Sequence, residues 1–357
     1  MVDLQDIRNL TLPEIEGFFR EKNEKSFRAK QVHEWIWKKN CRSFQEMTNL
    51  SRKTRRLLED NFCFPVLQED RESVSHDGTV KSIFRLADDA LVESVLIIAD
   101  GRTTACISSQ VGCALACRFC ATGMLGFKRN LKFTEIFDQV VLLNRQSEKH
   151  HGKPLSNIVY MGMGEPLMNY QEVIQSIDKI TSVEALGMSP QRITVSSVGI
   201  PKMIHQMADD DVKVHFALSL HAATNEKRDQ IIPLNKKHPL QDLTESLKYY
   251  HEKTGKRFTI EYILFRNFND GLDDAKSLAL FCKSFPVKIN LIEYNPVENS
   301  GFAQSDPEKT RAFKDFLEGR NLIVNTRKSR GKDIDAACGQ LALKEKNKEQ
   351  RSPVKKK

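Results

Sequence analysis

From about residue 100 onward, strand-like and helix-like segments alternate along this chain of 357 residues. The helix-like segments, such as 134–147 and 171–182, place Ile, Val and Phe residues at three- to four-residue spacing. This alternation predicts parallel β-α-β units joined by right-handed crossovers. About six such units would build a partial or complete barrel, and an open doubly wound sheet is the alternative. The expected strands are 103–108, 157–161, 192–197, 213–220, 257–264, 287–293 and 322–327.

Polar and glycine-rich residues gather where the expected strands end. In both architectures, ligands bind at the carboxyl ends of the parallel strands. We therefore expect a binding site at this end of the sheet. The residues concerned are the loop 106–120, Gly162-Met163-Gly164-Glu165, Ser196-Ser197, Ser219-Leu220-His221 and Asn295-Pro296.

The N-terminal region has a different pattern. Residues 1–65 predict three short helices. The first begins at Leu12-Pro13, the second carries Phe27, Val32 and Ile36 on one face, and the third extends over 51–62 with Ser51 as N-cap. Residues 66–98 predict strands at 81–86 and 91–98. We therefore expect an accessory domain over 1–95, a core domain over 96–342 and a basic tail over 343–357.

The net charge of +8 is unevenly distributed. The stretch 344–357 contributes +5, with seven Lys or Arg against two Glu, and its lack of hydrophobic periodicity predicts disorder. The stretch 25–56 has ten Lys or Arg, two acids and both tryptophans. Nucleic acid is a suitable partner for such a region. The alternative is a small helical core with a solvated charged face, and charge alone favours that alternative.

The chain shows no sign of secretion or membrane insertion. Its first residues have no basic segment followed by an apolar one, and no apolar stretch approaches the roughly 20 residues that span a bilayer. We therefore expect a cytoplasmic protein without membrane contact. In that setting, clustered cysteines indicate ligands or catalytic groups before structural disulfides.

Four of the eight cysteines lie within residues 106–120. Cys113, Cys117 and Cys120 have the spacing C-x-x-x-C-x-x-C, and Cys106 precedes them by seven residues. A structural zinc site uses four protein ligands, commonly as two C-x-x-C pairs, and this chain has no second pair. A [4Fe-4S] cluster held by only three cysteines would keep one iron open for a substrate or cofactor.

The loop, including Phe119, resembles the cluster-binding loop of the radical S-adenosylmethionine (SAM) enzymes. The segment Gly162-Met-Gly-Glu165-Pro166 resembles the glycine- and glutamate-containing motif of the same superfamily. The resemblance implies one [4Fe-4S] cluster on the three cysteines and SAM bound through its amino and carboxylate groups to the open iron. Reductive cleavage of SAM then gives a 5′-deoxyadenosyl radical. Glu165 is expected to accept a hydrogen bond from the SAM ammonium.

Near the C-terminus, Cys338 lies in the segment DIDAACGQL. Together with Cys106, Glu93 and the motifs CxSSQVGCxxxCxFC, GMGEP and SLH, it resembles the RlmN-type methyltransferases, over nearly the whole chain to about residue 342. The resemblance implies a partial (β/α) barrel of radical SAM type with a small helical N-terminal domain that engages structured RNA. It also implies methylation of adenine carbon 2 in 23S ribosomal RNA, at the peptidyl-transferase centre, and at adenine 37 of some transfer RNAs. With it, RNA becomes the favoured partner of the basic region.

Adenine carbon 2 is electron-poor and cannot attack the SAM methyl group directly. The family scheme implies that Cys338 takes a methyl group from one SAM and that a second SAM supplies the radical. It further implies that the S-methylcysteine then bonds to the base, that Cys106 releases the product by forming a disulfide with Cys338, and that Glu93 accepts a proton. Without the resemblance, Cys338 would be interpreted as a small buried hydrophobic residue.

The resemblance also implies a SAM site, an external flavodoxin-like electron donor and a monomeric enzyme. The chain departs from its relatives at Ser197-Val198-Gly199, where Thr-Ser-Gly is common, and we assign no role to residues 197 and 198. The implied SAM-binding residues are Gly164, Glu165, Ser196, Ser219, Leu220, His221 and Asn295.

Two alternatives remain open. A Cfr-type enzyme would methylate adenine carbon 8 with the same pair of cysteines, although Pro166 and the length of the match favour carbon 2. A non-enzymatic RNA-binding protein with a structural zinc ion is the alternative from another functional class.

Overall fold

The structure is a computed structural model that describes residues 4–99 and 101–343. Its main element is a ten-stranded sheet in the order β14-β13-β12-β11-β10-β9-β6-β5-β4-β3. The seven strands from β6 to β14 run parallel and follow one another in chain order. They are β6 (Arg102–Cys106), β9 (Asn157–Tyr160), β10 (Ile193–Ser197), β11 (His215–Ser219), β12 (Phe258–Leu264), β13 (Val287–Glu293) and β14 (Ile323–Arg327).

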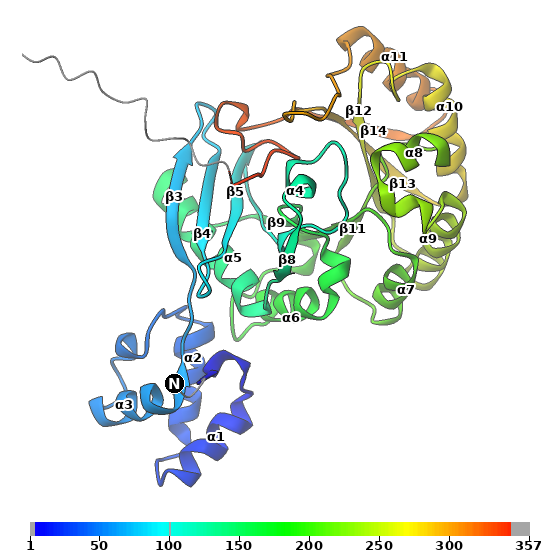
Figure 1. The fold of residues 1–357 in the computed structure, drawn as a ribbon. Helices are drawn as coiled ribbons and strands as arrows, with labels where there is room; N and C mark the ends of the chain where they lie inside the picture. Colours follow the sequence, from blue (N-terminus) through cyan, green and yellow to red (C-terminus); the bar gives the residue numbers. More distant parts are fainter. Residues whose placement is uncertain (1–3, 100, 344–357) are drawn as a thin grey trace, which may run out of the picture.

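The order of the parallel strands never reverses, so right-handed crossovers carry every connecting helix to the same face of the sheet. Figure 1 shows these helices around the outside of a curved sheet. A doubly wound sheet needs a reversal of strand order, and the partial barrel predicted from the sequence is therefore confirmed. The helices are α5 (Phe133–His151), α6 (Tyr170–Thr181), α7 (Pro201–Asp209), α8 (Asn225–Ile231), α9 (Leu240–Thr254), α10 (Leu272–Phe281) and α11 (Pro307–Glu318).

Three antiparallel strands extend the same sheet beyond β6. They are β3 (Gln68–Val74), β4 (Val80–Arg85) and β5 (Leu91–Ala99), and β5 pairs directly with β6. The expected domain boundary at residue 95 therefore lies inside a strand that is hydrogen-bonded on both sides. The strands at 81–86 and 91–98 were predicted, but β3 was not, because its sequence QEDRESV has no apolar alternation and most of it is exposed.

The N-terminal helices form where the sequence predicts them, as α1 (Leu12–Glu21), α2 (Phe27–Trp37) and α3 (Arg52–Asn61). Ser51 caps α3, since its hydroxyl accepts a hydrogen bond from the Thr54 amide at 3.1 Å. Two short strands, β1 (Gln5–Asp6) and β2 (Phe62–Cys63), bring the two ends of this region together. Trp37 is buried against α5, with its ring 5.3 Å from the ring of Phe137. Trp37 is therefore part of a hydrophobic core, as the alternative of a small helical core predicts, whereas Trp35 is half-exposed.

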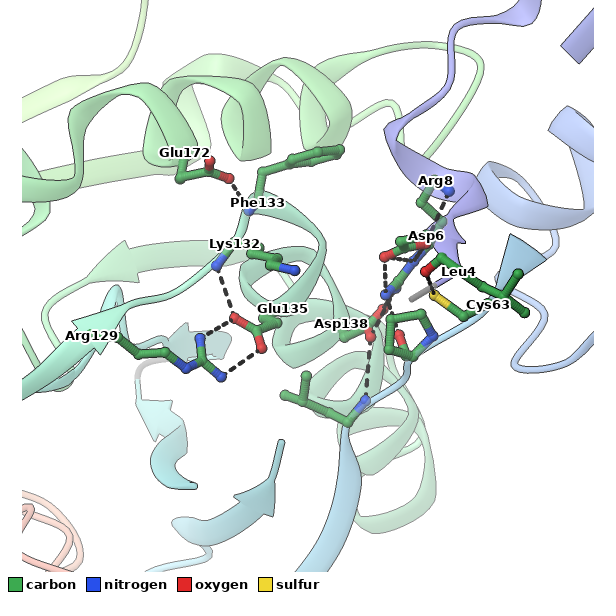
Figure 2. Close-up of polar contacts among 12 residues, drawn as sticks. Leu4, Asp6, Arg8, Cys63, Arg129, Lys132, Phe133, Glu135, Asp138 and Glu172 are labelled. Atoms are coloured by element: carbon green, nitrogen blue, oxygen red, sulfur yellow. Dashed lines mark hydrogen bonds and ion pairs between the residues drawn. The ribbon is translucent and has the colours of Figure 1, made fainter. Parts of the chain in front are cut away.

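A buried ion-pair network fastens the N-terminal region to α5 (Figure 2). The Arg8 guanidinium donates to both carboxylate oxygens of Asp138 at 2.9 Å and also binds Asp6. It donates as well to the carbonyl of Pro65, and the Leu67 amide donates to Asp138 at 3.3 Å. Arg8 and Asp138 are both buried. The network therefore joins the first residues of the chain, the connection to β3 and the core barrel.

Figure 2 also shows how the start of α5 is fixed. The Glu135 carboxylate accepts from the Lys132 amide and from the Arg129 guanidinium, at 2.8 Å each. The Phe133 amide donates to Glu172 of α6 at 2.6 Å. The helix that carries Asp138 is thus held at its own N-terminus.

Among residues 4–99 and 101–343, no helix is both long and apolar enough to span a bilayer.

Removal of the Arg8 side chain should leave the Asp138 carboxylate buried without its partner. We predict that Arg8→Ala lowers the free energy of unfolding by about 3–5 kcal/mol, measured by urea denaturation. Lys276→Ala is the control, because it removes an exposed ion pair with Asp273 and should cost less than about 1 kcal/mol. Equal losses in the two variants would contradict a docking role for Arg8.

Candidate active site

A cavity of about 220 Å³ lies at the carboxyl ends of the parallel strands. It is lined by residues from β5, β6, β9, β10, β11, β12, β13 and β14, and by the C-terminal segment. This is the end of the sheet where the sequence predicts a site. Ten of the predicted site residues line it: Cys106, Cys113, Cys117, Cys120, Gly164, Glu165, Ser196, Ser219, His221 and Cys338.

The cysteine loop is closed by a short antiparallel ribbon. Strands β7 (Gln110–Gly112) and β8 (Phe127–Asn130) pair at the base of the loop, and the Cys113 amide donates to the Gly126 carbonyl at 2.9 Å. Gly112 has a φ of +75°, and a Cβ there would lie 1.9 Å from the Gly126 oxygen. Only glycine allows this approach. The helical turn α4 (Ala121–Met124) follows Cys120 directly.

The three cysteines of this loop line one cavity, where Cys113 and Cys117 are buried and Cys120 is half-buried. Burial raises the pKa of Cys113 to about 11 and that of Cys117 well above its usual range. The neighbouring Cys120 and Cys113 raise the pKa of Cys117 further. Thiolates in such a place need a positive group to offset their desolvation, which is what a metal centre provides.

The arrangement of the thiols bears on the kind of metal centre. Within the described residues, no three His, Cys, Asp or Glu side chains are arranged to bind one metal ion. The cysteine ligands of a four-iron cluster bind different iron atoms and need not meet at one point. The donor set of three thiols lining one cavity fits a cluster, and Cys113, Cys117 and Cys120 are the residues that would hold it.

The end of β9 brings the Gly-Glu motif to the cavity wall. Gly164 has a φ of +99°, and a Cβ there would lie 2.5 Å from the Gln110 Cβ, so the turn requires glycine. The Glu165 carboxylate is buried and accepts from the backbone amides of Leu167 and Val198, at 3.0 Å each. Burial raises the pKa of Glu165, and these hydrogen bonds oppose that shift. The carboxylate is thereby oriented by the backbone of two neighbouring strand ends.

Neighbouring strand ends supply three further polar groups. The hydroxyls of Ser196 and Ser219 lie 3.1 Å apart at the ends of β10 and β11. The Nδ1 of His221 accepts from the Ile263 amide at 3.1 Å, so the ring proton is on Nε2. Burial lowers the pKa of His221 to about 3, which keeps its imidazole neutral. These groups can exchange hydrogen bonds with a ligand without adding charge to the cavity.

Three predicted residues do not line the cavity. Leu220 is fully buried, and Asn295 donates to the Cys338 carbonyl at 3.2 Å. The buried Glu93 carboxylate lies 3.3 Å from the Lys81 ammonium and also accepts from the Leu343 amide. Glu93 and Val95 lie on the same face of β5. Val95 lines the cavity, and Glu93 lies two residues earlier in the strand, just outside the lining. Asn295 and Glu93 contact the segment that carries Cys338, and their predicted roles stay predictions.

Residues 328–343, here called the strap, cross the open side of the barrel. The strap leaves β14, contains a short 3₁₀ turn at Lys332–Ile334, and passes toward β4 and β5, as the red segment of Figure 1 shows. The Gly331 amide donates to the Asp77 carboxylate at 3.0 Å, and the Lys81 ammonium donates to the Asp335 carbonyl at 3.2 Å. The Gly339 carbonyl accepts from the Ala121 amide at 2.8 Å. The strap is thus attached to both ends of the sheet and to the cysteine loop.

The strap brings Cys338 to the cavity that Cys106 also lines. Cys106 is the last residue of β6 and is buried. Cys338 has exposed surface, and because Cys338 lines the cavity, this surface faces the cavity. Burial raises the pKa of Cys106 to about 12, and the neighbouring Cys338 adds to that shift. The surface of Cys338 opens into the cavity, and desolvation by the surrounding protein raises the pKa of its thiol to about 11, although the Arg327 guanidinium opposes that shift. Two protonated thiols, more than two hundred residues apart in sequence, therefore interact in one cavity.

Sequence reasoning missed two buried charged residues, Glu261 in the cavity lining and Arg228 outside it. The Arg228 side chain is buried, donates to the Leu220 carbonyl at 3.1 Å and also binds the Val198 carbonyl. The Glu261 carboxylate is buried in the lining, 3.5 Å from the Arg327 guanidinium. A single acid within the apolar strand FTIEYIL was a usable signal for Glu261. The helix NEKRDQI gave none for Arg228, since its charges resemble an ordinary solvated face.

Two family models match the chain. The one described as the ribosomal RNA large subunit methyltransferase N-terminal domain matches residues 5–64, and the one described as the radical SAM superfamily matches residues 107–279. A protein from Christiangramia forsetii, named a probable dual-specificity RNA methyltransferase RlmN, is 53% identical over 95% of this chain and 97% of its own length. A protein of the same name from Thermotoga neapolitana is 44% identical over 96% of this chain and 99% of its own.

A solved structure has the same fold. The radical SAM methyltransferase from Sphaerobacter thermophilus superposes with a TM-score of 0.89 at 36% identity, over 94% of this chain and 99% of its own. The likeness therefore extends over nearly the whole chain.

The neutral His221 gives a test by pH. Its pKa is about 3 in the folded chain and near 6.5 when exposed, so acid favours the unfolded state, and its contribution to stability is lost as pH falls below 6.5. Between about pH 7.5 and 5.5 the wild type should lose free energy of unfolding. We predict that His221→Asn loses about 1.4 kcal/mol less than the wild type over the same range, measured by urea denaturation. His76→Asn, at a fully exposed side chain, should keep the wild-type pH dependence. An unchanged pH dependence in His221→Asn would show that the ring is not held neutral.

Proposed function

Because this chain belongs to the RlmN family of radical SAM methyltransferases, we propose that it methylates carbon 2 of adenine in RNA. The proposed targets are an adenine of 23S ribosomal RNA at the peptidyl-transferase centre and adenine 37 of some transfer RNAs. The observation that carries this proposal is the meeting of Cys106 and Cys338 in the cavity that the cysteine loop also lines. A cluster site needs three cysteines, and two further thiols in the same cavity support a reaction that uses sulfur as a carrier of carbon.

The family implies a [4Fe-4S] cluster and SAM as cofactors. Bound to Cys113, Cys117 and Cys120, the cluster would supply the electron that cleaves SAM to methionine and a 5′-deoxyadenosyl radical. Glu165 is suited to receive the SAM ammonium, because its carboxylate is already oriented by the amides of Leu167 and Val198. The hydroxyls of Ser196 and Ser219 and the Nε2 proton of His221 offer neutral hydrogen bonds to the rest of the molecule.

Cys338 is the proposed methyl carrier. Its thiol loses a proton, and its sulfur takes the methyl group of one SAM, whose sulfonium becomes a neutral thioether. The exposure of Cys338 in the cavity lining supports this role, and the Arg327 guanidinium opposes the rise in its pKa, which favours the reactive thiolate. The Asn295 amide donates to the carbonyl of Cys338 and holds its backbone. Two SAM molecules are consumed in each methylation, since a second one supplies the radical.

Cys106 and Glu93 are the proposed partners of the release step. After hydrogen abstraction, the carbon on Cys338 bonds to adenine carbon 2 and joins the protein to the RNA. The radical adduct gives up one electron, which the cluster would take back, and Glu93 takes the proton of carbon 2. The Cys106 thiolate then attacks the Cys338 sulfur, forms a disulfide and breaks the bond from Cys338 to the carbon, whose electron pair takes up a proton to complete the methyl group. The position of both cysteines in the lining of one cavity supports this pairing. The contact between Glu93 and the strap at Leu343 supports a coupling of the acid to the same segment.

The remaining partners follow from the same assignment. The N-terminal region is proposed to engage structured RNA, and half-exposed Trp35 is one aromatic group available to it, since Trp37 is packed against α5. A flavodoxin-like protein is proposed as the external electron donor and the monomer as the working unit. The cytoplasm, where ribosomal and transfer RNA occur, is the proposed compartment. The basic tail predicted over 343–357 lies outside the described residues, apart from Leu343.

Nucleoside mass spectrometry of RNA tests the proposed function. Anaerobically purified protein, incubated with SAM, a reductant and transcribed RNA, should produce 2-methyladenosine. Cys338→Ala should produce none, because it lacks the methyl-carrying sulfur, and Cys282→Ala, at a buried cysteine outside the cavity lining, should keep the activity.

The possible products separate the alternatives. 8-Methyladenosine without 2-methyladenosine would contradict the carbon-2 assignment and favour a Cfr-type reaction. Bound zinc without iron, together with no cleavage of SAM under reductant, would contradict enzymatic function and favour a zinc-containing RNA-binding protein.

A further inference from the structure

Three cationic residues stand at the point where β14 passes into the strap. Arg327 ends β14, and Lys328, Ser329 and Arg330 follow it, and all four line the active-site cavity. We call residues 327–330 the rim. Lys328 is exposed, and Ser329 and Arg330 are half-buried, so the cationic groups lie where the cavity meets solvent.

The cations of the rim differ in their partners. Arg327 lies 3.5 Å from the buried Glu261 carboxylate, which offsets its charge on the cavity side. In the part of the chain that the structure describes, no carboxylate lies within 4.0 Å of the charged nitrogens of Lys328 or Arg330. Lys332, two residues beyond the rim, is by contrast paired with Glu293 at 2.6 Å. Lys328 and Arg330 therefore keep their full charge available to an anion.

The rim is held in place on both sides. At its start, β14 pairs in parallel with β13, with Arg327 opposite Ile292. At its end, Gly331 has a φ of +65°, its amide donates to Asp77, and a Cβ there would lie 2.8 Å from the Ala336 Cβ and 2.9 Å from the Thr79 Cγ2. The close packing leaves room only for glycine. Four residues fixed at both ends present their charges in a narrow range of positions, which lowers the entropic cost of binding.

We propose that Lys328 and Arg330 bind the RNA phosphates that flank the nucleotide whose base enters the cavity. This inference rests on the proposed function, because it takes RNA as the substrate. An enzyme that acts on a base within paired or stacked RNA has to move that base out of its stack, and the phosphates on either side then remain at the mouth of the site. The ammonium of Lys328 and the guanidinium of Arg330 suit those phosphates, since a guanidinium can bind two phosphate oxygens at once.

A second kind of acidic partner could use the same charges. An electron-donor protein with an acidic surface would also be attracted to Lys328 and Arg330. The geometry favours RNA, because the rim borders the cavity that the target base must enter, and phosphates adjoining that base are covalently required to lie nearby. A protein donor has no such constraint on where it docks.

The test uses the full-length protein loaded with its cluster, a transcribed transfer RNA, and a small-molecule reductant, so that no protein donor takes part. The double variant Lys328→Ala, Arg330→Ala should raise the KM for RNA about tenfold. It should also reduce the slope of log binding constant against log salt by about 2, one for each lost phosphate contact. The charge-conserving pair Lys328→Arg, Arg330→Lys should restore most of the affinity and the wild-type slope.

Lys332→Ala is the matched control. It removes a cation from the same segment, but one already paired with Glu293 and absent from the cavity lining, so it should leave both the KM and the salt slope near the wild-type values. If the wild type methylates RNA and the double variant behaves like Lys332→Ala, the rim does not bind phosphate and the proposed function still stands. A second assay replaces the small-molecule reductant with a protein electron donor. If the double variant is defective only in that assay, the rim binds the donor and the inference is overturned. If the wild type itself neither binds nor methylates RNA, both the inference and the proposed function fail.

Discussion

The attachment of the strap across the open barrel is the constraint on which the site depends. The parallel strands bring the cysteine loop, the Gly-Glu turn and the serine and histidine groups to one edge of the sheet, but they leave that edge open. The strap is fastened to Asp77 and Lys81 on one side, and it continues from β14 on the other. Its Gly339 carbonyl binds the backbone just after Cys120. These bonds place Cys338 in the cavity with Cys106, so the pair exists only when the chain has closed on itself.

Charge is distributed in a consistent way around this cavity. Inside it, burial keeps His221 neutral and raises the pKa of Cys106 and Cys338, and the Glu165 carboxylate is satisfied by backbone amides. The formal charges in the wall are held by partners, as for Glu261 beside Arg327. The cations without carboxylate partners among the described residues lie at the mouth. A largely neutral interior suits radical chemistry, and a cationic mouth suits a polyanionic substrate.

The sequence allowed much of the fold to be predicted, because periodicity and cap residues act locally. The seven parallel strands, the three N-terminal helices and the Ser51 cap follow from such patterns. Strand β3 escaped prediction because its pairing with β4, and not its own sequence, makes it a strand. The partnership of Arg8 with Asp138 joins residues 130 positions apart, and no local pattern indicates it. In the site, ten of the predicted residues line the cavity, but Leu220, Asn295 and Glu93 lie outside the lining, because side-chain direction depends on the packed structure.

The cooperation of Cys106 with Cys338 is the central claim, and the most direct test is mass analysis of purified Cys106→Ala. Without the resolving thiol, product release should fail, so the variant should carry RNA covalently linked through Cys338. Cys41→Ala, at a buried cysteine in the N-terminal region, should purify free of RNA like the wild type. Recovery of Cys106→Ala as free and fully active enzyme would contradict the claim.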